Sequence, residues 1–188
     1  MMEQLKRLLD LGEEGMEKPE SRFEEIANDL FHHYHIRKSK DTYDFLEIEF
    51  YYYTGKHKDV ITYRRTSPPG YWFFHQSGVD ITFASEEGKS YGGILIRSLL
   101  KNGETVIAGP LKCKRDLFDR FDAFEEKGEF PLIEKKKETT PKQIIQTQRW
   151  IRLDEHKARR RFLNEYDSFE QFRTAPYRFF VKEIKHPI

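Results

Sequence analysis

The most constraining feature of this sequence is an alternation of apolar and polar residues that begins at Asp44. Successive side chains of a β-strand point to opposite faces, so a period of two gives each face its own set of residues. One face is apolar and the other combines acids with tyrosines: Leu46, Ile48, Phe50 and Tyr52 against Glu47, Glu49, Tyr51 and Tyr53. The pattern predicts a strand with two chemically different faces.

Two turn signals follow this strand. Gln76-Ser77-Gly78 separates apolar runs at residues 71–75 and 79–83, and Asn102-Gly103 separates runs at residues 92–99 and 104–108. Asn-Gly between two strand-like runs is a strong hairpin signal, because both residues tolerate positive φ. We therefore expect a mainly antiparallel, curved sheet built from hairpins.

Helical spacing of apolar residues occurs on both sides of the expected sheet. The expected helices cover residues 3–11, 21–36, 112–126, 141–153 and 155–164, and a possible last strand covers residues 177–184. We predict an α/β protein of the α+β type, with N-terminal and C-terminal helices around the sheet.

The length of 188 residues suits one domain that folds around its own core. Within this single domain we expect N-terminal helices in residues 1–40, the sheet core in 44–117, an exposed linker in 134–140, and C-terminal helices and a strand in 141–188.

Cysteine content and the N-terminal sequence bear on the compartment. Cys113 is the only cysteine, so no internal disulfide can form and no cysteine cluster can hold zinc. The N-terminal apolar stretch is too short and too charged for a signal sequence or a membrane span. We expect a cytoplasmic protein that does not associate with membranes.

Three patterns in the sheet region occur in the order found in a known family. They are Leu46-Glu47-Ile48-Glu49-Phe50-Tyr51, then Pro69-Gly70-Tyr71-Trp72-Phe73-Phe74 followed by Gly93-Ile94-Leu95-Ile96-Arg97-Ser98-Leu99, and then Ala108-Gly109-Pro110-Leu111-Lys112. They resemble, in turn, the E-x-E-x-Y strand, the P-G aromatic hairpin with its V-L-L-R-A-L strand, and the S-G-P-x-K turn of the alkyladenine (3-methyladenine) DNA glycosylases. The resemblance covers about residues 44–117.

This resemblance implies the family's fold and its DNA-repair activity. The chain is then a monofunctional base-excision glycosylase, a hydrolase that cleaves the N-glycosidic bond of alkylated or deaminated purines in double-stranded DNA. It implies Glu49 as the residue that activates water, Arg97 as the active-site arginine, and Tyr51 and Phe74 as stacking aromatics. No cofactor or metal is expected, and we expect a monomer.

Three departures from the family pattern concern base recognition. The stacking histidine corresponds to Ile61 unless the loop is realigned to use His57, the wedge tyrosine to Ser77, and the base-facing asparagine to Ala84. These changes favour an alternative: a non-catalytic protein of the same fold that binds nucleic acid or another ligand.

The proposed site residues have structural interpretations as well. Glu49 and Tyr51 lie on one strand face about 7 Å apart, which suits a base stacked near a carboxylate, but such a face is commonly just solvated. Arg97 in an apolar run serves either the site or a structural ion pair. Lys112, at an expected helix start, either meets phosphate or is a surface lysine.

The charge of the chain is balanced overall, with 33 basic and 32 acidic residues, but it is distributed unevenly. Residues 1–29 are acidic and residues 142–161 are basic. Arg149, Arg152 and Arg160 in the basic stretch are candidates for contacts with the DNA backbone. A solvated helix face paired with the acidic N-terminal segment explains the same charges.

Two groups of histidines remain. His32 and His35 near a helix end have no evident third ligand for a metal, so we interpret them as structural. His57, His75, Asp59 and Asp80 form a looser set near the sheet turns, whose residue types suit either a metal or acid–base chemistry.

Overall fold

The computed structural model describes residues 2–12, 18–119, 130–139, 141–149 and 151–182. Its helices are α1 (Met2–Leu8), α3 (Glu20–His33), α4 (Pro110–Leu117), α5 (Glu155–Arg161) and α6 (Tyr166–Arg173). Its strands are β1 (Tyr34–Lys38), β2 (Asp41–Thr54), β3 (Trp72–His75), β4 (Gly78–Thr82), β5 (Ser90–Lys101), β6 (Thr105–Ala108), β7 (Leu132–Lys135), β8 (Ile144–Thr147) and β9 (Arg178–Val181).

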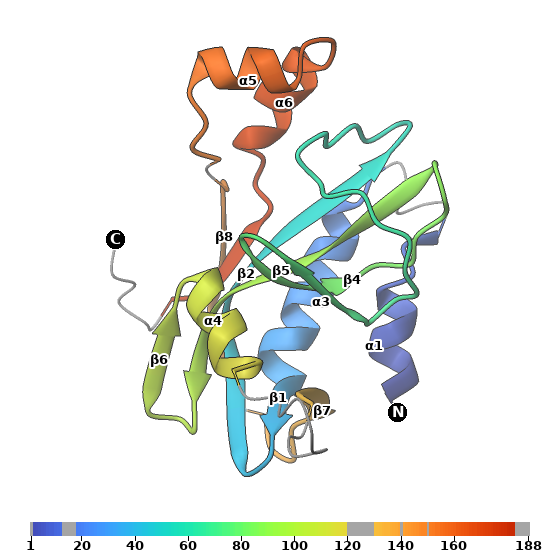
Figure 1. The fold of residues 1–188 in the computed structure, drawn as a ribbon. Coiled ribbons are helices and arrows are strands. Elements are labelled where there is room, and N and C mark those ends of the chain that lie inside the picture. The colour runs from blue at the N-terminus through green and yellow to red at the C-terminus, as the bar shows by residue number, and fades with distance from the viewer. Residues whose placement is uncertain (1, 13–17, 120–129, 140, 150, 183–188) are drawn as a thin grey trace, which may run out of the picture.

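The strands form one antiparallel sheet that curls into a half-barrel (Figure 1). The main path runs β3-β4-β5-β2-β1-β7, and β6 pairs with β5. The strand β9 pairs with β2 on one edge and with β8 on the other. The predicted α+β class with a mainly antiparallel, curved sheet is confirmed.

Both predicted hairpins are present. Strands β3 and β4 pair from Trp72–Ile81 to His75–Gly78, and β5 pairs with β6 across the second turn. At that turn Asn102 has φ 52° and Gly103 has φ 73°, the two positive values that a type I′ turn requires. The hairpins therefore follow from the local turn residues.

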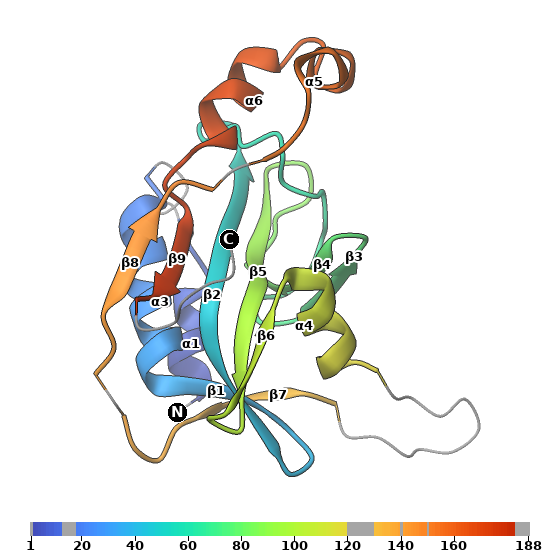
Figure 2. The same cartoon turned by 90° about the vertical axis from the view of Figure 1, so that its left-hand side faces the viewer.

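Helices α1 and α3 cover the apolar face of the sheet. The alternation in β2 buries Ile48, Phe50 and Tyr52 toward α3, where the Phe23 ring stacks on Phe50 at 4.5 Å. Helix α4 packs on β4 and β5 from the opposite side, as both ribbon views show (Figures 1 and 2). The charged face of β2 thus looks toward the α4 side rather than toward α3.

Helices α5 and α6 lie together beyond the end of β2 (Figures 1 and 2). They enclose a small apolar cluster of Ala158, Phe162 and Phe169, separate from the main core. Val60 and Ile61 from the loop after β2 pack against this cluster. That loop therefore connects the lobe of α5 and α6, hereafter the C-terminal lobe, to the sheet.

Three expected elements differ in the structure. The helix predicted at 141–153 is wrong: residues 144–147 form β8, because the β-branched pair Ile144-Ile145 lies beside the open edge of β9. Residues 134 and 135 of the expected linker are strand residues of β7, paired with β1. The helix predicted at 21–36 ends at His33, where the chain turns directly into β1.

The last part of the helix expected at 112–126 lies outside the described residues from position 120 onward, and α4 itself begins at Pro110. The expected helix at 155–164 and the last strand are confirmed as α5 and β9. In the part of the chain that the structure describes, no helix has the length and apolar character needed to cross a membrane.

Candidate functional site

The polar face of β2 carries two buried carboxylates. Glu47 and Glu49 are only 4% and 2% exposed, although the alternation left a solvated face open. The strand pairing places Leu95 of β5 beside Glu49 on one side and Arg178 of β9 on the other. Arginine side chains from the neighbouring strands β5 and β9, Arg97 and Arg178, project from the same face and pair with these carboxylates.

Arg97 joins the two carboxylates. Its Nε donates to Glu47 at 2.6 Å, and its Nη1 donates to Glu49 at 3.0 Å. Burial alone lowers the pKa of Arg97, but the charges of Glu49 and Glu47 outweigh it and raise the pKa. Arg178 Nε lies 2.7 Å from Glu47, which completes a compact ion-paired cluster, hereafter the carboxylate cluster.

Tyr51 links the carboxylate cluster to a pocket. Its hydroxyl donates to Glu49 Oε2 at 2.8 Å. Burial, followed by the charge of Glu49, raises the pKa of Tyr51 well above the usual value for tyrosine. Tyr51 is therefore a neutral phenol that donates to the carboxylate, and the residue also lines the neighbouring cavity. The Arg149 guanidinium lies 4.5 Å from the centre of its ring.

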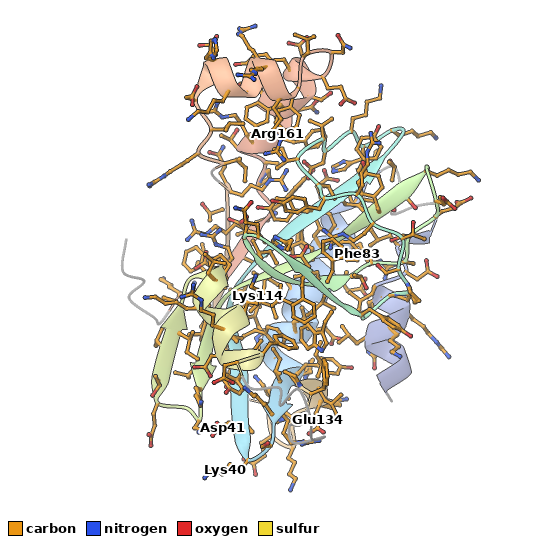
Figure 3. All side chains as sticks on the ribbon, viewed as in Figure 1. Lys40, Asp41, Phe83, Lys114, Glu134 and Arg161 are labelled. Atoms are coloured by element: carbon orange, nitrogen blue, oxygen red, sulfur yellow. The ribbon has the colours of Figure 1, made fainter. Side chains whose placement is uncertain are left out.

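This cavity, hereafter the aromatic pocket, has a volume of about 200 Å³. It lies where the polar face meets the β3–β4 turn, residues 151–153 and α5. Its lining residues are Tyr51, Ile61, Tyr63, His75, Ser77, Asp80, Leu95, Ile151, Arg152, Leu153 and Arg161. Arg161 marks the α5 end of the molecule, opposite the β1–β2 turn at Lys40 and Asp41 (Figure 3).

Asp80 fixes one wall of the aromatic pocket. Arg65 Nη1 donates to its Oδ2 at 2.8 Å, and His75 Nε2 lies 2.9 Å from its Oδ1. The backbone N–H of Ser77 donates to His75 Nδ1 at 3.2 Å, which suits a ring that carries its proton on Nε2 alone. The Tyr63 ring lies 4.8 Å from the His75 ring. The charged groups of this wall are paired, and its rings line the cavity.

Gly93 makes room for this wall. A Cβ atom at Gly93 would lie 2.9 Å from Arg65 Nη1 and 2.8 Å from the carbonyl oxygen of Ile81. Any larger residue would push the Arg65 guanidinium away from Asp80. The resemblance to V-L-L-R-A-L included Gly93 without indicating this packing role.

Arg149 is the clearest correction to the sequence-based assignments. It was a candidate for contact with the DNA backbone, but it is 0% exposed and its Nη2 lies 2.7 Å from Asp59. Its Nε and Nη1 donate to the carbonyl oxygens of Phe172 and Phe50, at 3.0 and 2.8 Å. A buried guanidinium needs such partners, and these leave it facing the interior rather than a phosphate.

Three other predicted residues lie away from the aromatic pocket. Phe74 is 49% exposed and packs edge-on against Phe118, because alternation in β3 turns Phe73 and His75 to the other side. His57 is 5% exposed, between Tyr52 and Phe172, where burial lowers its pKa. Arg160 is exposed on α5 but does not line the cavity.

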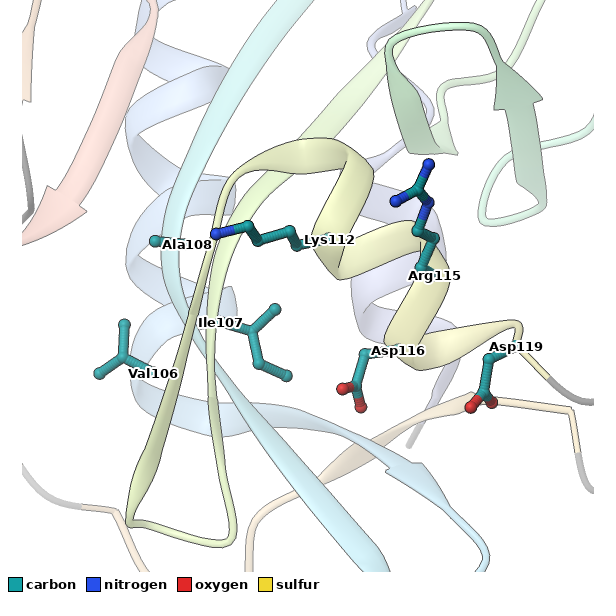
Figure 4. Close-up of a pocket in the computed structure, with 7 residues that line it drawn as sticks. All are labelled: Val106, Ile107, Ala108, Lys112, Arg115, Asp116 and Asp119. Carbon is teal, nitrogen blue, oxygen red and sulfur yellow. The ribbon is translucent and has the colours of Figure 1, made fainter.

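Lys112 lines a separate groove of about 640 Å³ between β6 and α4 (Figure 4). Its side chain points from α4 toward β6 at Ala108, whereas Arg115 points toward the β3–β4 hairpin. Asp116 accepts from the Tyr43 hydroxyl at 2.8 Å, and Asp119 accepts from Lys38. The two cations diverge and the carboxylates are engaged, so the groove has no convergent set of free groups.

The structure thus brings together Glu49, Arg97 and Tyr51, with Arg152 at the adjacent pocket. Sequence reasoning did not assign Tyr63 or Arg65 to the site, and it included Arg161 only as part of the basic stretch 142–161. It named His75 and Asp80 only in a loose set with His57 and Asp59. The period of two along β3 was the signal available, since it puts His75 on the face opposite Phe74. The described residues contain no group of three or more His, Cys, Asp or Glu side chains placed to hold a metal ion.

Comparison of the chain with protein-family models and with curated proteins finds no match. The resemblance to the alkyladenine DNA glycosylases therefore stays a prediction that rests on the three patterns alone.

Proposed function

We propose that this protein binds nucleic acid and takes one unpaired base into the aromatic pocket. The observation that carries the proposal is a small cavity with the rings of Tyr51, Tyr63 and His75 in its wall and the arginines Arg152 and Arg161 also lining it. Aromatic rings stack on any base, and arginines attract the phosphate backbone.

The size of the cavity supports a small, planar ligand. Its volume of about 200 Å³ is below the range of roughly 300–1,000 Å³ that drug-sized ligands occupy. One base with one or two fused rings suits such a space better than a larger ligand. An extruded base leaves its sugar and phosphates outside, where the arginines lie.

Two residues that the family resemblance singles out also line this cavity. Ile61 corresponds to the stacking histidine and Ser77 to the wedge tyrosine, and both are lining residues. Ala84 is not; its backbone N–H donates to Leu9 at 3.0 Å. The fold of the glycosylase family and its base-binding position are therefore part of the proposal, with Tyr63 and His75 supplying rings in place of the missing ones.

Hydrolysis of the glycosidic bond is the second candidate function. One contact favours it: Glu49 is one hydrogen bond from the cavity, through the Tyr51 hydroxyl. A carboxylate that activates water must reach that water. Tyr51 and Arg97 both donate to the same oxygen of Glu49, Oε2. Catalysis would therefore have to bring water to the other oxygen, Oε1, whereas binding requires no water at Glu49.

The test combines a binding assay with a base-release assay. Fluorescence anisotropy would measure affinity for a single strand, a matched duplex, and duplexes containing hypoxanthine, ethenoadenine or 3-methyladenine, at low and high salt. We expect tighter binding of the single strand and the lesion duplexes than of the matched duplex. Alkali cleavage of abasic sites in the same samples reports hydrolysis.

A matched pair of variants assigns the binding to the aromatic pocket. Arg161→Ala should weaken binding, whereas Lys40→Ala should not, because it removes an exposed cation at the β1–β2 turn, at the opposite end of the molecule from Arg161 (Figure 3). Absence of DNA binding at low salt would overturn the proposal. Base release that is lost in Glu49→Gln would establish the hydrolase instead of a binding protein alone.

A further inference from the structure

A second cavity lies on the other side of the β3–β4 hairpin, between α1, the start of β3 and the β1–β7 edge. It has a volume of about 270 Å³ and shares no lining residue with the aromatic pocket. Its apolar wall comes from Leu5, Leu9, Tyr34, Trp72, Leu132 and Ile133. We call it the α1 cavity.

The wall of the α1 cavity is held in place without a ligand. Leu9 and Tyr34 are 1% and 2% exposed, so they belong to the core. The Trp72 indole N–H donates to the carbonyl oxygen of Pro131 at 3.0 Å, and its ring meets Phe118 edge-on at 5.5 Å. A preformed apolar cavity of this kind takes an apolar group with little reorganisation.

The charges at this cavity favour an anion. Within the described residues the exposed Lys6 has no carboxylate partner, and its side chain runs past Gly70, 3.6 Å from the position of a Cβ there. Glu134, the one acid in the lining, accepts from Arg37 Nε at 2.9 Å, so its charge is compensated. Counting only partners that the structure describes, Lys6 is the charge of the lining that remains without compensation.

We propose that the α1 cavity binds a small anionic amphiphile, such as a medium-chain carboxylate. The hydrocarbon chain lies against Leu9, Tyr34 and Trp72, and the carboxylate meets the Lys6 ammonium. Apolar burial supplies the affinity and the single cation supplies the selection for a negative head group.

Trp72 provides the readout. In Trp150→Phe, Trp72 is the only tryptophan, and its fluorescence would be titrated with hexanoate, octanoate, octanol and octylammonium. If this variant does not fold, titration calorimetry on the unaltered protein gives the same dissociation constants. Octanoate should bind about fifteenfold more tightly than hexanoate, since it has two more methylenes and each contributes about fourfold. It should also bind more tightly than octanol or octylammonium.

Two pairs of variants locate the ligand. Lys6→Glu should weaken octanoate binding about threefold or more and favour octylammonium, whereas Lys40→Glu at the distant β1–β2 turn should change neither. Leu132→Asp places a charge in the cavity and should abolish octanoate binding, whereas Leu163→Asp, at a 77% exposed position outside it, should not.

Equal binding of octanoate and octylammonium, no binding at all, or an unchanged octanoate affinity in both Lys6→Glu and Leu132→Asp would each overturn the proposal. None of these outcomes bears on the aromatic pocket, because Arg161 and Tyr63 lie outside the α1 cavity.

Discussion

Glu49 and Asp80 are both buried carboxylates on the polar side of the sheet, yet only one of them reaches a cavity. Glu49 bonds to Arg97 and Tyr51 and lines no described cavity, whereas Asp80 bonds to Arg65 and His75 and also lines the aromatic pocket. Helix α4 packs against β4 and β5, while the C-terminal lobe reaches the main core through Phe172 of α6 and through the loop of Val60 and Ile61. The elements packed over each carboxylate therefore determine whether it only stabilises the fold or also forms part of a cavity wall.

Substitution of Arg149 should have the largest effect on stability, because its side chain is fully buried and lines no described cavity. Arg149→Met leaves Asp59 buried without its ion-pair partner, and we expect a loss of about 3–5 kcal/mol in the free energy of unfolding. Urea unfolding would measure it. The double variant Arg149→Met with Asp59→Asn should recover part of the loss; no loss in the single variant would contradict the interior position of Arg149.

Glu49→Gln tests whether the carboxylate cluster is structural. Arg97 keeps its bond to Glu47, so we expect a smaller loss of stability, about 1–3 kcal/mol, with nucleic-acid affinity unchanged. The measurements are urea unfolding and anisotropy on the same samples. A change in nucleic-acid affinity without a change in stability would instead assign Glu49 to the aromatic pocket.

Tyr63→Ala tests the aromatic pocket. A base stacked on this ring contributes about 1–3 kcal/mol to binding. Tyr63 is 37% exposed and its ring lies 4.8 Å from the His75 ring, so removing the ring should also cost about 1–2 kcal/mol of stability. Tyr71→Ala is the control, since Tyr71 is 57% exposed and lies outside the pocket. Equal losses of affinity in the two variants would count against the aromatic pocket.

Protonation of His57 should have the smallest effect on stability, and this effect depends on pH. Burial lowers its pKa in the folded state, so below about pH 6.5, the ordinary histidine value, the unfolded chain takes up the proton first. Stability should therefore fall as pH falls from the ordinary value toward the lowered one. Urea midpoints at pH 7.5 and 5.5 measure this drop, and His57→Gln should reduce it; an equal drop in the variant would assign the effect to other groups.

Local patterns predicted the parts of the fold that local forces determine. The alternation in β2 and the Asn102-Gly103 turn predicted the strand faces and the hairpin, because side-chain period and positive φ act over a few residues. The strand β8 was missed because it exists only through pairing with β9, which lies later in the chain. Spacing within residues 144–147 alone does not distinguish it from a helix.

The site was predicted less well for a related reason. Glu47, Glu49 and Arg149 are buried by partners distant in sequence, such as Arg178 and Asp59. A charge pattern shows where basic residues are frequent in the sequence. It does not show which basic side chain is buried. Arg149 and Arg152 look alike in the sequence, and only the fold separates an interior guanidinium from one that lines a cavity.

The position of Arg149 also determines how far this protein can be dissected. One guanidinium is bonded to the strand through Phe50, to the loop through Asp59 and to the end of α6 through Phe172. A shortened chain that lacks residues 149–182 would uncover the part of the sheet that these residues pack against. Asp59 would then be left among apolar side chains without its ion-pair partner. The C-terminal lobe is therefore an integral part of the fold and not a detachable module.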